Sequence, residues 1–92
     1  TMYIVTTSWK HNEPIDPEKM TAHLTSLKGS QEGVVDVMWF KIDEHTHGSV
    51  LIYESEQHYI NATAARDENR KTSGVSMLSE QKGATIAVMS KL

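Results

Sequence analysis

Histidine is the residue of this chain best suited to acid–base chemistry or metal binding, and five are present. His45 and His47 lie two positions apart, directly after Asp43 and Glu44. Imidazole and carboxylate groups are ligands that zinc and nickel accept, but this segment offers no third converging side chain. We therefore interpret it as the solvated tip of a hairpin and predict no metal site.

His23 and His58 are the candidate catalytic residues. Each lies in a predicted helix, where a neutral imidazole facing a space between helices and sheet could orient a polar group or act as a base. The alternative is a surface or boundary histidine, because His23 lies beside Leu24 and Leu27 in the sequence but off the apolar stripe that they form.

Aromatic and methionine side chains could line a pocket for an apolar ligand, because rings and thioethers adapt to irregular shapes. Tyrosine hydroxyls or His58 would then hold a carbonyl or carboxylate group. The alternative for each residue is ordinary core packing. The candidate ligand-binding residues are Tyr3, Met20, Met38, Trp39, Phe40, Tyr53, His58 and Tyr59.

Length and composition exclude several classes of function. The 92 residues have room for one core, so we expect a single domain over 1–92. The absence of cysteine excludes disulfides and thiolate metal sites, and a formal charge of −3 argues against nucleic acid as a partner. We expect no membrane association, a cytoplasmic location and no cofactor. Arg66, Arg70 and Lys71 are interpreted as a solvated helix end.

Strand and helix signals alternate along the chain in the order β-α-β-β-α-β. Asp16 and Pro17 are typical of a helix start, and Ser55 is a plausible cap for the second helix. This order predicts an α+β, ferredoxin-like fold with a four-stranded antiparallel sheet and both helices on one face. The predicted strands cover 2–8, 34–42, 50–53 and 84–90, the predicted helices cover 16–28 and 55–71, and a short helical turn covers 75–82.

Apolar side chains occupy both parities of the predicted strands. Trp39 and Phe40 are neighbours in the second strand, as are Leu51 and Ile52 in the third. A sheet covered by helices on one side only should instead present polar residues to water on the other. The second apolar face must be shielded from water, and the same face of a second copy is the simplest partner for it. We therefore predict a homodimer.

Two segments carry a resemblance to a known family. Residues 32–35 (Glu-Gly-Val-Val) open the second strand, and residues 52–59 (Ile-Tyr-Glu-Ser-Glu-Gln-His-Tyr) join an apolar strand to a capped helix with an aromatic residue. In this order and spacing they resemble the dimeric α+β barrels, which include antibiotic-biosynthesis-type monooxygenases and stress-response barrel proteins. The resemblance implies a ferredoxin-like sheet that pairs into a barrel, and in some members a cofactor-free oxidation of aromatic or haem substrates. No catalytic residue carries over, because the first strand lacks asparagine and Trp39 adjoins no evident base.

Three functions remain open from the sequence. The first is the binding of a small apolar or amphipathic organic molecule, fatty-acid-like or aromatic, between sheet and helices. The second is a cofactor-independent monooxygenase or isomerase acting on an activated aromatic or carbonyl substrate, with His58 or His23 as base and Trp39 or Tyr53 positioning the substrate. The third is a dimerisation domain with no further activity.

Overall fold

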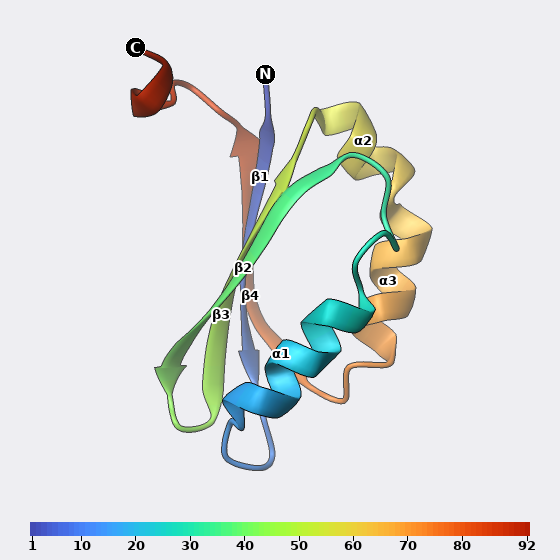
Figure 1. Ribbon diagram of the computed structural model, residues 1–92, viewed down its shortest axis with the longest axis vertical. Helices are drawn as coiled ribbons and strands as arrows, with labels where there is room; N and C mark the ends of the chain where they lie inside the picture. Colours follow the sequence, from blue (N-terminus) through green and yellow to red (C-terminus); the bar gives the residue numbers. More distant parts are fainter.

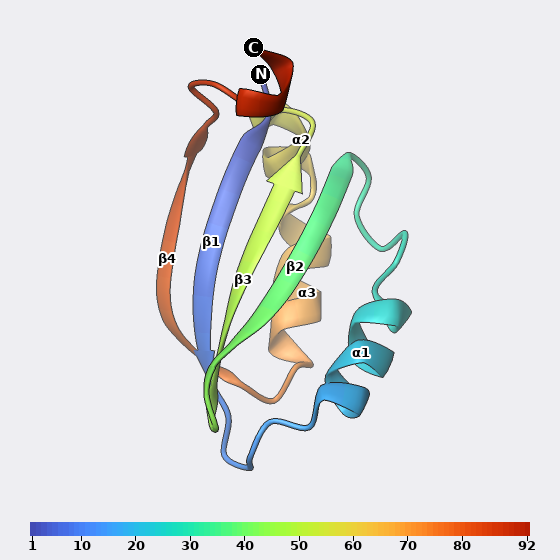
Figure 2. The ribbon, with the colours of Figure 1, turned by 60° about the vertical axis from the view of Figure 1, so that its left-hand side comes forward.

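One antiparallel sheet of four strands forms the body of the molecule, and the three α-helices cover one of its faces (Figures 1 and 2). The computed structural model describes all of residues 1–92. The predicted ferredoxin-like α+β fold is confirmed. The strands are β1 (Tyr3–Lys10), β2 (Val34–Asp43), β3 (Thr46–Tyr53) and β4 (Ser76–Ala84), and they lie side by side in the order β2-β3-β1-β4. The α-helices are α1 (Pro17–Ser26), α2 (Glu56–Asn61) and α3 (Thr63–Lys71). A short 3-10 helix, η1 (Met89–Lys91), follows β4.

The alternation of β1 decides which face the helices cover. Tyr3, Val5, Thr7 and Trp9 are buried, whereas the residues between them are less so. Successive side chains of a strand point to opposite faces, so these four project toward the helices. The strand is longer than predicted, because the same alternation continues past Ser8 to Lys10.

Helix α1 begins where the sequence predicts. The Asp16 carboxylate accepts hydrogen bonds from the backbone N–H groups of Glu18, at 3.0 Å, and Lys19, at 3.4 Å, and Pro17 occupies the first turn. These contacts satisfy N–H groups that have no partner within the helix. The helix ends at Ser26, two residues before the predicted end, and contains no buried residue.

The predicted second helix is two helices. Ser55 caps α2 as expected, its hydroxyl oxygen accepting from the His58 N–H at 3.2 Å. The backbone then leaves regular helix at Ala62, whose φ and ψ are −87° and 3°, and α3 begins at Thr63. Ala62 is buried, so packing against the sheet supports the chain where helical hydrogen bonding is interrupted.

The prediction for the last third of the chain is wrong. Residues 76–82, predicted as part of a helical turn over 75–82, form most of β4, and of the predicted strand 84–90 only Ala84 belongs to β4. Strand β4 pairs with β1, from Tyr3 opposite Ala84 to Lys10 opposite Ser76. Its side chains are mostly polar, because it is an edge strand whose residues, apart from the half-buried Glu80, are exposed to solvent. Because of this polar composition the sequence did not predict a strand here, whereas the apolar run after Gly83 has the composition of a strand.

The hairpin between β2 and β3 is also tighter than predicted. Strand β3 begins at Thr46, four residues before the expected position, and Asp43 pairs with Thr46 across a short turn. His47 therefore lies within the strand, not at a solvated tip, and is only 5% exposed.

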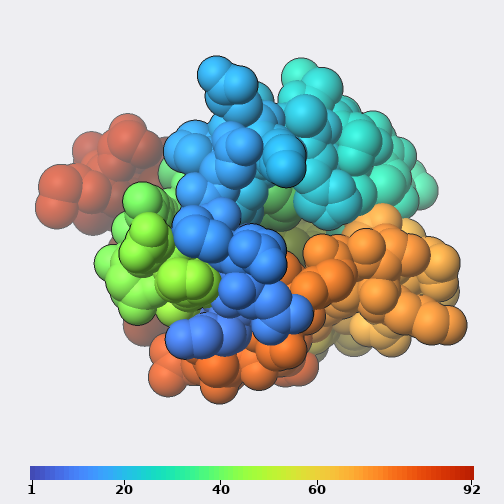
Figure 3. All heavy atoms as spheres, turned by 90° about the horizontal axis from the view of Figure 1, so that it is seen from below, coloured from blue at the N-terminus to red at the C-terminus, as the bar shows by residue number.

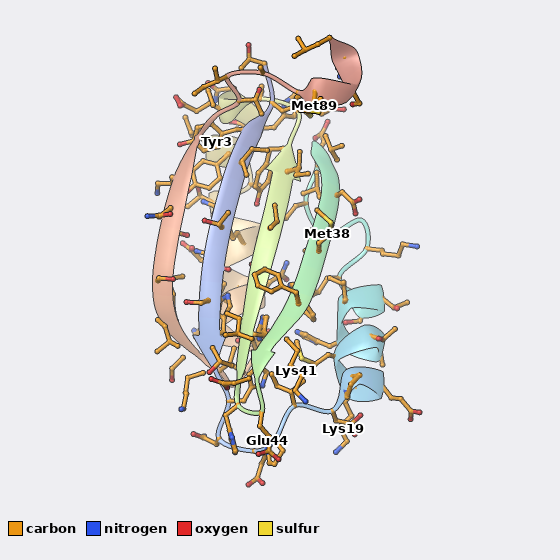
Figure 4. All side chains as sticks on the ribbon, turned by 90° about the vertical axis from the view of Figure 1, so that its left-hand side faces the viewer. Tyr3, Lys19, Met38, Lys41, Glu44 and Met89 are labelled. Carbon is orange, nitrogen blue, oxygen red and sulfur yellow. The ribbon has the colours of Figure 1, made fainter.

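The other face of the sheet is uncovered. Met38, Phe40 and Ile42 of β2 are all about half exposed on it, and Phe40 lies over Gly48 of β3, where a Cβ would clash with its ring. Figure 4 views this face, with Met38 projecting from it and Met89 near its upper end. Toward β1 and β4 the face becomes polar, with Ser8 and Ser79 joined by a hydrogen bond. None of the helices combines the length and the apolar character of a membrane-spanning segment.

Candidate functional site

A cavity of about 720 Å³ lies between the sheet and the helices. Strands β1, β2 and β3 form its floor, and α1 and α3 form its walls. Figure 3 shows the hollow between α1, in blue to cyan, and the orange segment that contains α3. Apolar residues on its α1 side are Met20, Leu24 and Leu27.

Both tryptophans of the chain line this cavity. Trp39 of β2 stacks on the His23 ring of α1 with centroids 5.8 Å apart. The ring of His47 in β3 lies 5.4 Å from Trp39 and 6.5 Å from Trp9 of β1. Three strands and one helix thus bring planar rings to one place, where aromatic groups can stack.

His11 and His47 form a hydrogen-bonded pair on the cavity floor. His11 Nε2 lies 2.6 Å from His47 Nδ1, so one ring donates and the other accepts. Burial, and to a smaller extent the charge of His11, lower the pKa of His47 from 6.5 to about 4. Burial also lowers the pKa of His11, with a smaller effect from His45. At neutral pH both rings are therefore uncharged and available as bases or acceptors.

Two buried hydroxyl groups lie beside this pair. Thr7 of β1 and Ser49 of β3 are hydrogen-bonded to each other across the strands, and Trp9 Nε1 donates to Thr7 Oγ1 at 2.7 Å. One of the two hydroxyls donates to the other, so the remaining O–H has no acceptor among these groups and can donate to a bound molecule. A polar atom of a ligand would meet hydroxyl and imidazole groups here.

Arginines of α3 complete the wall. Arg66 and Arg70 are four positions apart and both line the cavity, although the sequence reading placed them at a solvated end. Arg66 is 4% exposed, and Arg70 lies with its guanidinium carbon 5.5 Å from the centre of the Trp9 ring. The solvated interpretation is therefore wrong for Arg66. Its side chain is held by the Tyr59 carbonyl and the Thr63 hydroxyl.

Three of the candidate residues lie at the cavity: Met20, His23 and Trp39. The candidate tyrosines instead pack together beyond it. Tyr59 lies 5.0 Å from the ring of Tyr3 and 5.5 Å from that of Tyr53. Two of their hydroxyls are engaged, since Tyr53 donates to Gln31 and Tyr59 accepts from Lys82.

The remaining candidates lie elsewhere. His58 contacts Ser55 at 2.7 Å and Glu54 at 3.3 Å, and its ring covers Gly33, where a Cβ would clash with it. Met38 and Phe40 project from the uncovered face, because their parity on β2 is opposite to that of Trp39. These three side chains are not part of the cavity between sheet and helices.

Three residues line the cavity that the sequence did not predict as site residues: Trp9, His11 and Arg66. The alternation that places Thr7 on the helix side continues through Trp9 to His11, and this signal could have identified both residues. For Arg66 the signal was its spacing of four from Arg70. Ser49 carried no signal, because a buried serine becomes visible only once the register of β3 with β1 is known.

No protein-family model and no curated protein matches the chain. Solved structures do. A putative antibiotic biosynthesis monooxygenase from Chloroflexus aurantiacus J-10-fl matches with a TM-score of 0.70 at 11% sequence identity. SnoaB, a cofactor-independent oxygenase from Streptomyces nogalater, matches with a TM-score of 0.69 at 7% sequence identity. Each match covers 96% of this chain and 96% of the other. A dimeric ferredoxin-like protein from an uncultured marine organism has 0.61 at 13%, covering 96% of this chain and 90% of that one.

This chain has their fold. The similarity extends over nearly its whole length, and it agrees with the antiparallel sheet and one-sided helices described above. At these identities the likeness concerns the fold alone.

Proposed function

We propose that this chain binds a small organic molecule with a mainly apolar, aromatic body in the cavity between its sheet and helices. The observation that carries the proposal is the preformed cavity itself, which holds both tryptophans and a few polar groups. Its volume of about 720 Å³ is within the range usual for ligand pockets.

The lining supports an aromatic rather than a purely aliphatic ligand. Trp9 and Trp39 offer two ring faces, and His23 and His47 add planar rings beside them. Offset stacking on such rings contributes about 0.5–1.5 kcal/mol beyond the burial of apolar area. The hydroxyls of Thr7 and Ser49 then offer hydrogen bonds to a carbonyl or hydroxyl group of the ligand.

A neutral aromatic probe tests this proposal. N-phenyl-1-naphthylamine should bind saturably in a fluorescence titration, and the two tryptophan indole N–H signals should shift in NMR spectra. Leu24→Trp places a ring in the cavity and should weaken binding by about tenfold or more, equal to about 1.4 kcal/mol. The control is Lys71→Trp on the exposed surface of α3.

The same experiment can refute the proposal. Unsaturable binding, unshifted indole signals, or equal affinities for Leu24→Trp and Lys71→Trp would show that the probe binds outside the cavity.

A second candidate function is base-assisted chemistry without a cofactor, and the neutral His11–His47 pair is the observation that favours it. When His47 Nδ1–H donates to His11 Nε2, the Nε2 lone pair of His47 remains to accept a proton. Removal of a proton from a carbon next to a carbonyl gives an enolate, which either regains a proton at another atom or reacts with dioxygen. SnoaB, of the same fold, is a cofactor-independent oxygenase.

Deuterium exchange of 2-tetralone, an aromatic ketone, tests the basic role of His47. In D2O the protein should speed exchange at the carbon between ring and carbonyl beyond the rate in buffer. His47→Gln should lower this rate by about tenfold or more, within the usual contribution of a general base. His58→Gln, outside the cavity, should leave it unchanged, and exchange no faster than in buffer would contradict the role.

We also propose that two copies pair through the uncovered face. Met38, Phe40 and Ile42 form an apolar patch there that no element of the chain covers. The dimeric ferredoxin-like protein supports this assembly, because it shares the fold. Exposed patches of this kind commonly mark protein interfaces.

A further inference from the structure

Positive charge is concentrated around the cavity although the chain as a whole is acidic. The chain has 9 lysines and arginines against 12 aspartates and glutamates, a formal charge of −3. The lining reverses this balance, because it contains four basic residues and one acidic residue. They are Lys19 and Lys28 of α1 and its following turn, Arg66 and Arg70 of α3, and Asp36 of β2.

Arg66 is the most informative member of this set. Its side chain is 4% exposed, yet none of the ion pairs of the chain includes it. Its Nη1 donates to the Tyr59 carbonyl at 2.9 Å and its Nη2 to the Thr63 hydroxyl at 3.2 Å, while its Nε has no acceptor. The Tyr59 ring lies 3.9 Å from the guanidinium carbon. All of these contacts are with neutral groups.

A buried cation without a counter-charge is costly, because the interior replaces its lost hydration only in part. Arg70 shows the ordinary solution one turn along the same helix. Its Nη2 lies 2.9 Å from Glu80 Oε2, and Glu80 also lies near Lys82, at 3.7 Å. Arg66 has no such carboxylate, and it forms part of the cavity wall.

We propose that the ligand of this cavity is an organic anion whose acidic group faces Arg66. The inference rests on the proposed binding function and specifies its ligand class: a ring system that carries a carboxylate, a sulfonate or an enolate oxygen. The anion supplies the counter-charge that Arg66 lacks, and charge-assisted hydrogen bonds to arginine are stronger than those between neutral groups. Lys19 and Lys28 add to the attraction at the opening of the cavity.

Two probes with one ring skeleton isolate the effect of the charge. 1-Anilinonaphthalene-8-sulfonate is N-phenyl-1-naphthylamine with one added sulfonate. The wild-type protein should bind the anion about tenfold or more tightly than the neutral probe. Both should shift the indole N–H signals of Trp9 and Trp39, which places them in the cavity.

Variants of Arg66 connect this preference to the residue. Arg66→Met keeps most of the side-chain length and should remove the preference for the anion, whereas Arg66→Lys should retain part of it. Lys71→Met, on the exposed side of α3, changes the net charge by the same amount and should leave the preference intact. Unchanged affinity of Arg66→Met for the neutral probe shows that the cavity is still formed.

The outcomes separate this inference from the proposed function. Equal affinities of the wild type for the two probes, or a preference for the anion that survives Arg66→Met, would overturn the anion proposal alone. Absence of saturable binding by either probe would overturn the binding function itself. If Arg66→Met no longer binds the neutral probe, the test is made with Arg66→Lys instead. An Arg66→Lys variant that still binds the neutral probe but has lost all preference for the anion would contradict the proposal.

Discussion

The His11–His47 pair keeps the cavity floor uncharged around neutral pH. A single hydrogen bond of 2.6 Å joins the rings, so a doubly protonated pair would set two N–H donors against each other. Burial opposes even the first charge, as the lowered pKa values of both residues show. An anionic ligand would therefore find its positive partner on α3 rather than among the histidines.

The pair should make the stability of the protein depend on pH. The pKa of His47 is 6.5 in the unfolded chain and about 4 in the folded protein, so the unfolded state binds more protons between these values. The free energy of unfolding should therefore fall as pH decreases from about 6.5 to about 4, by an amount on the order of 2 kcal/mol. Urea unfolding at several pH values measures it.

His47→Gln should flatten this dependence, whereas His58→Gln in α2, outside the cavity, should leave it in place. A free energy of unfolding that stays constant or rises on acidification in the wild type would contradict a neutral buried pair.

Individual residues were the least predictable level of this protein. His23 and Trp39 are recognisable because their types stand out in a helix and a strand that the sequence predicts well. His47 was misjudged, since its neighbours Asp43 and Glu44 are polar and the strand that buries it begins only at Thr46. Burial of such a residue is decided by pairing between strands, which is not a local property.

Helices and strands were more predictable wherever local chemistry specifies them. Asp16 with Pro17 and Ser55 mark the two main helix starts correctly, because capping depends on residues close in the sequence. Strand β4 was missed for the opposite reason. Its polar side chains acquire their roles from distant partners, such as Glu80 from Arg70 and Lys82 from the Tyr59 hydroxyl.

Helix α3 shows what this means for the site. Read alone, the stretch from Arg66 to Lys71 is a charged segment suited to water. In the folded protein, the spacing of four places the side chains of Arg66 and Arg70 at the cavity, while Lys71 remains exposed. One helix thus supplies both a charged wall and a solvated surface.

The whole molecule has one covered and one uncovered sheet face. The overall architecture was predictable because the order of apolar runs, caps and glycines admits few topologies. The sequence could not show which strand parity faces the helices, since both parities are apolar in β2. The structure places Trp39 inside and Met38 outside.

The uncovered face should hold two chains together. Sedimentation at micromolar concentration should yield a dimer for the wild type, and Met38→Glu should shift it toward single chains, because a carboxylate loses its hydration on burial in an apolar interface. Gln57→Glu changes the charge equally on exposed α2 and should remain dimeric. A wild-type protein that sediments only as single chains would refute the pairing.

Helix α1 forms one side of the cavity yet buries none of its own residues. Strands β1 and β3 carry most of the buried residues, and Ala62 and Arg66 are buried beside them, so the fold depends little on what α1 presents. Substitutions on its inner surface should accordingly change the free energy of unfolding only a little. Substitutions in α1, in evolution or by design, can therefore change which ligand the cavity selects while the rest of the fold stays intact.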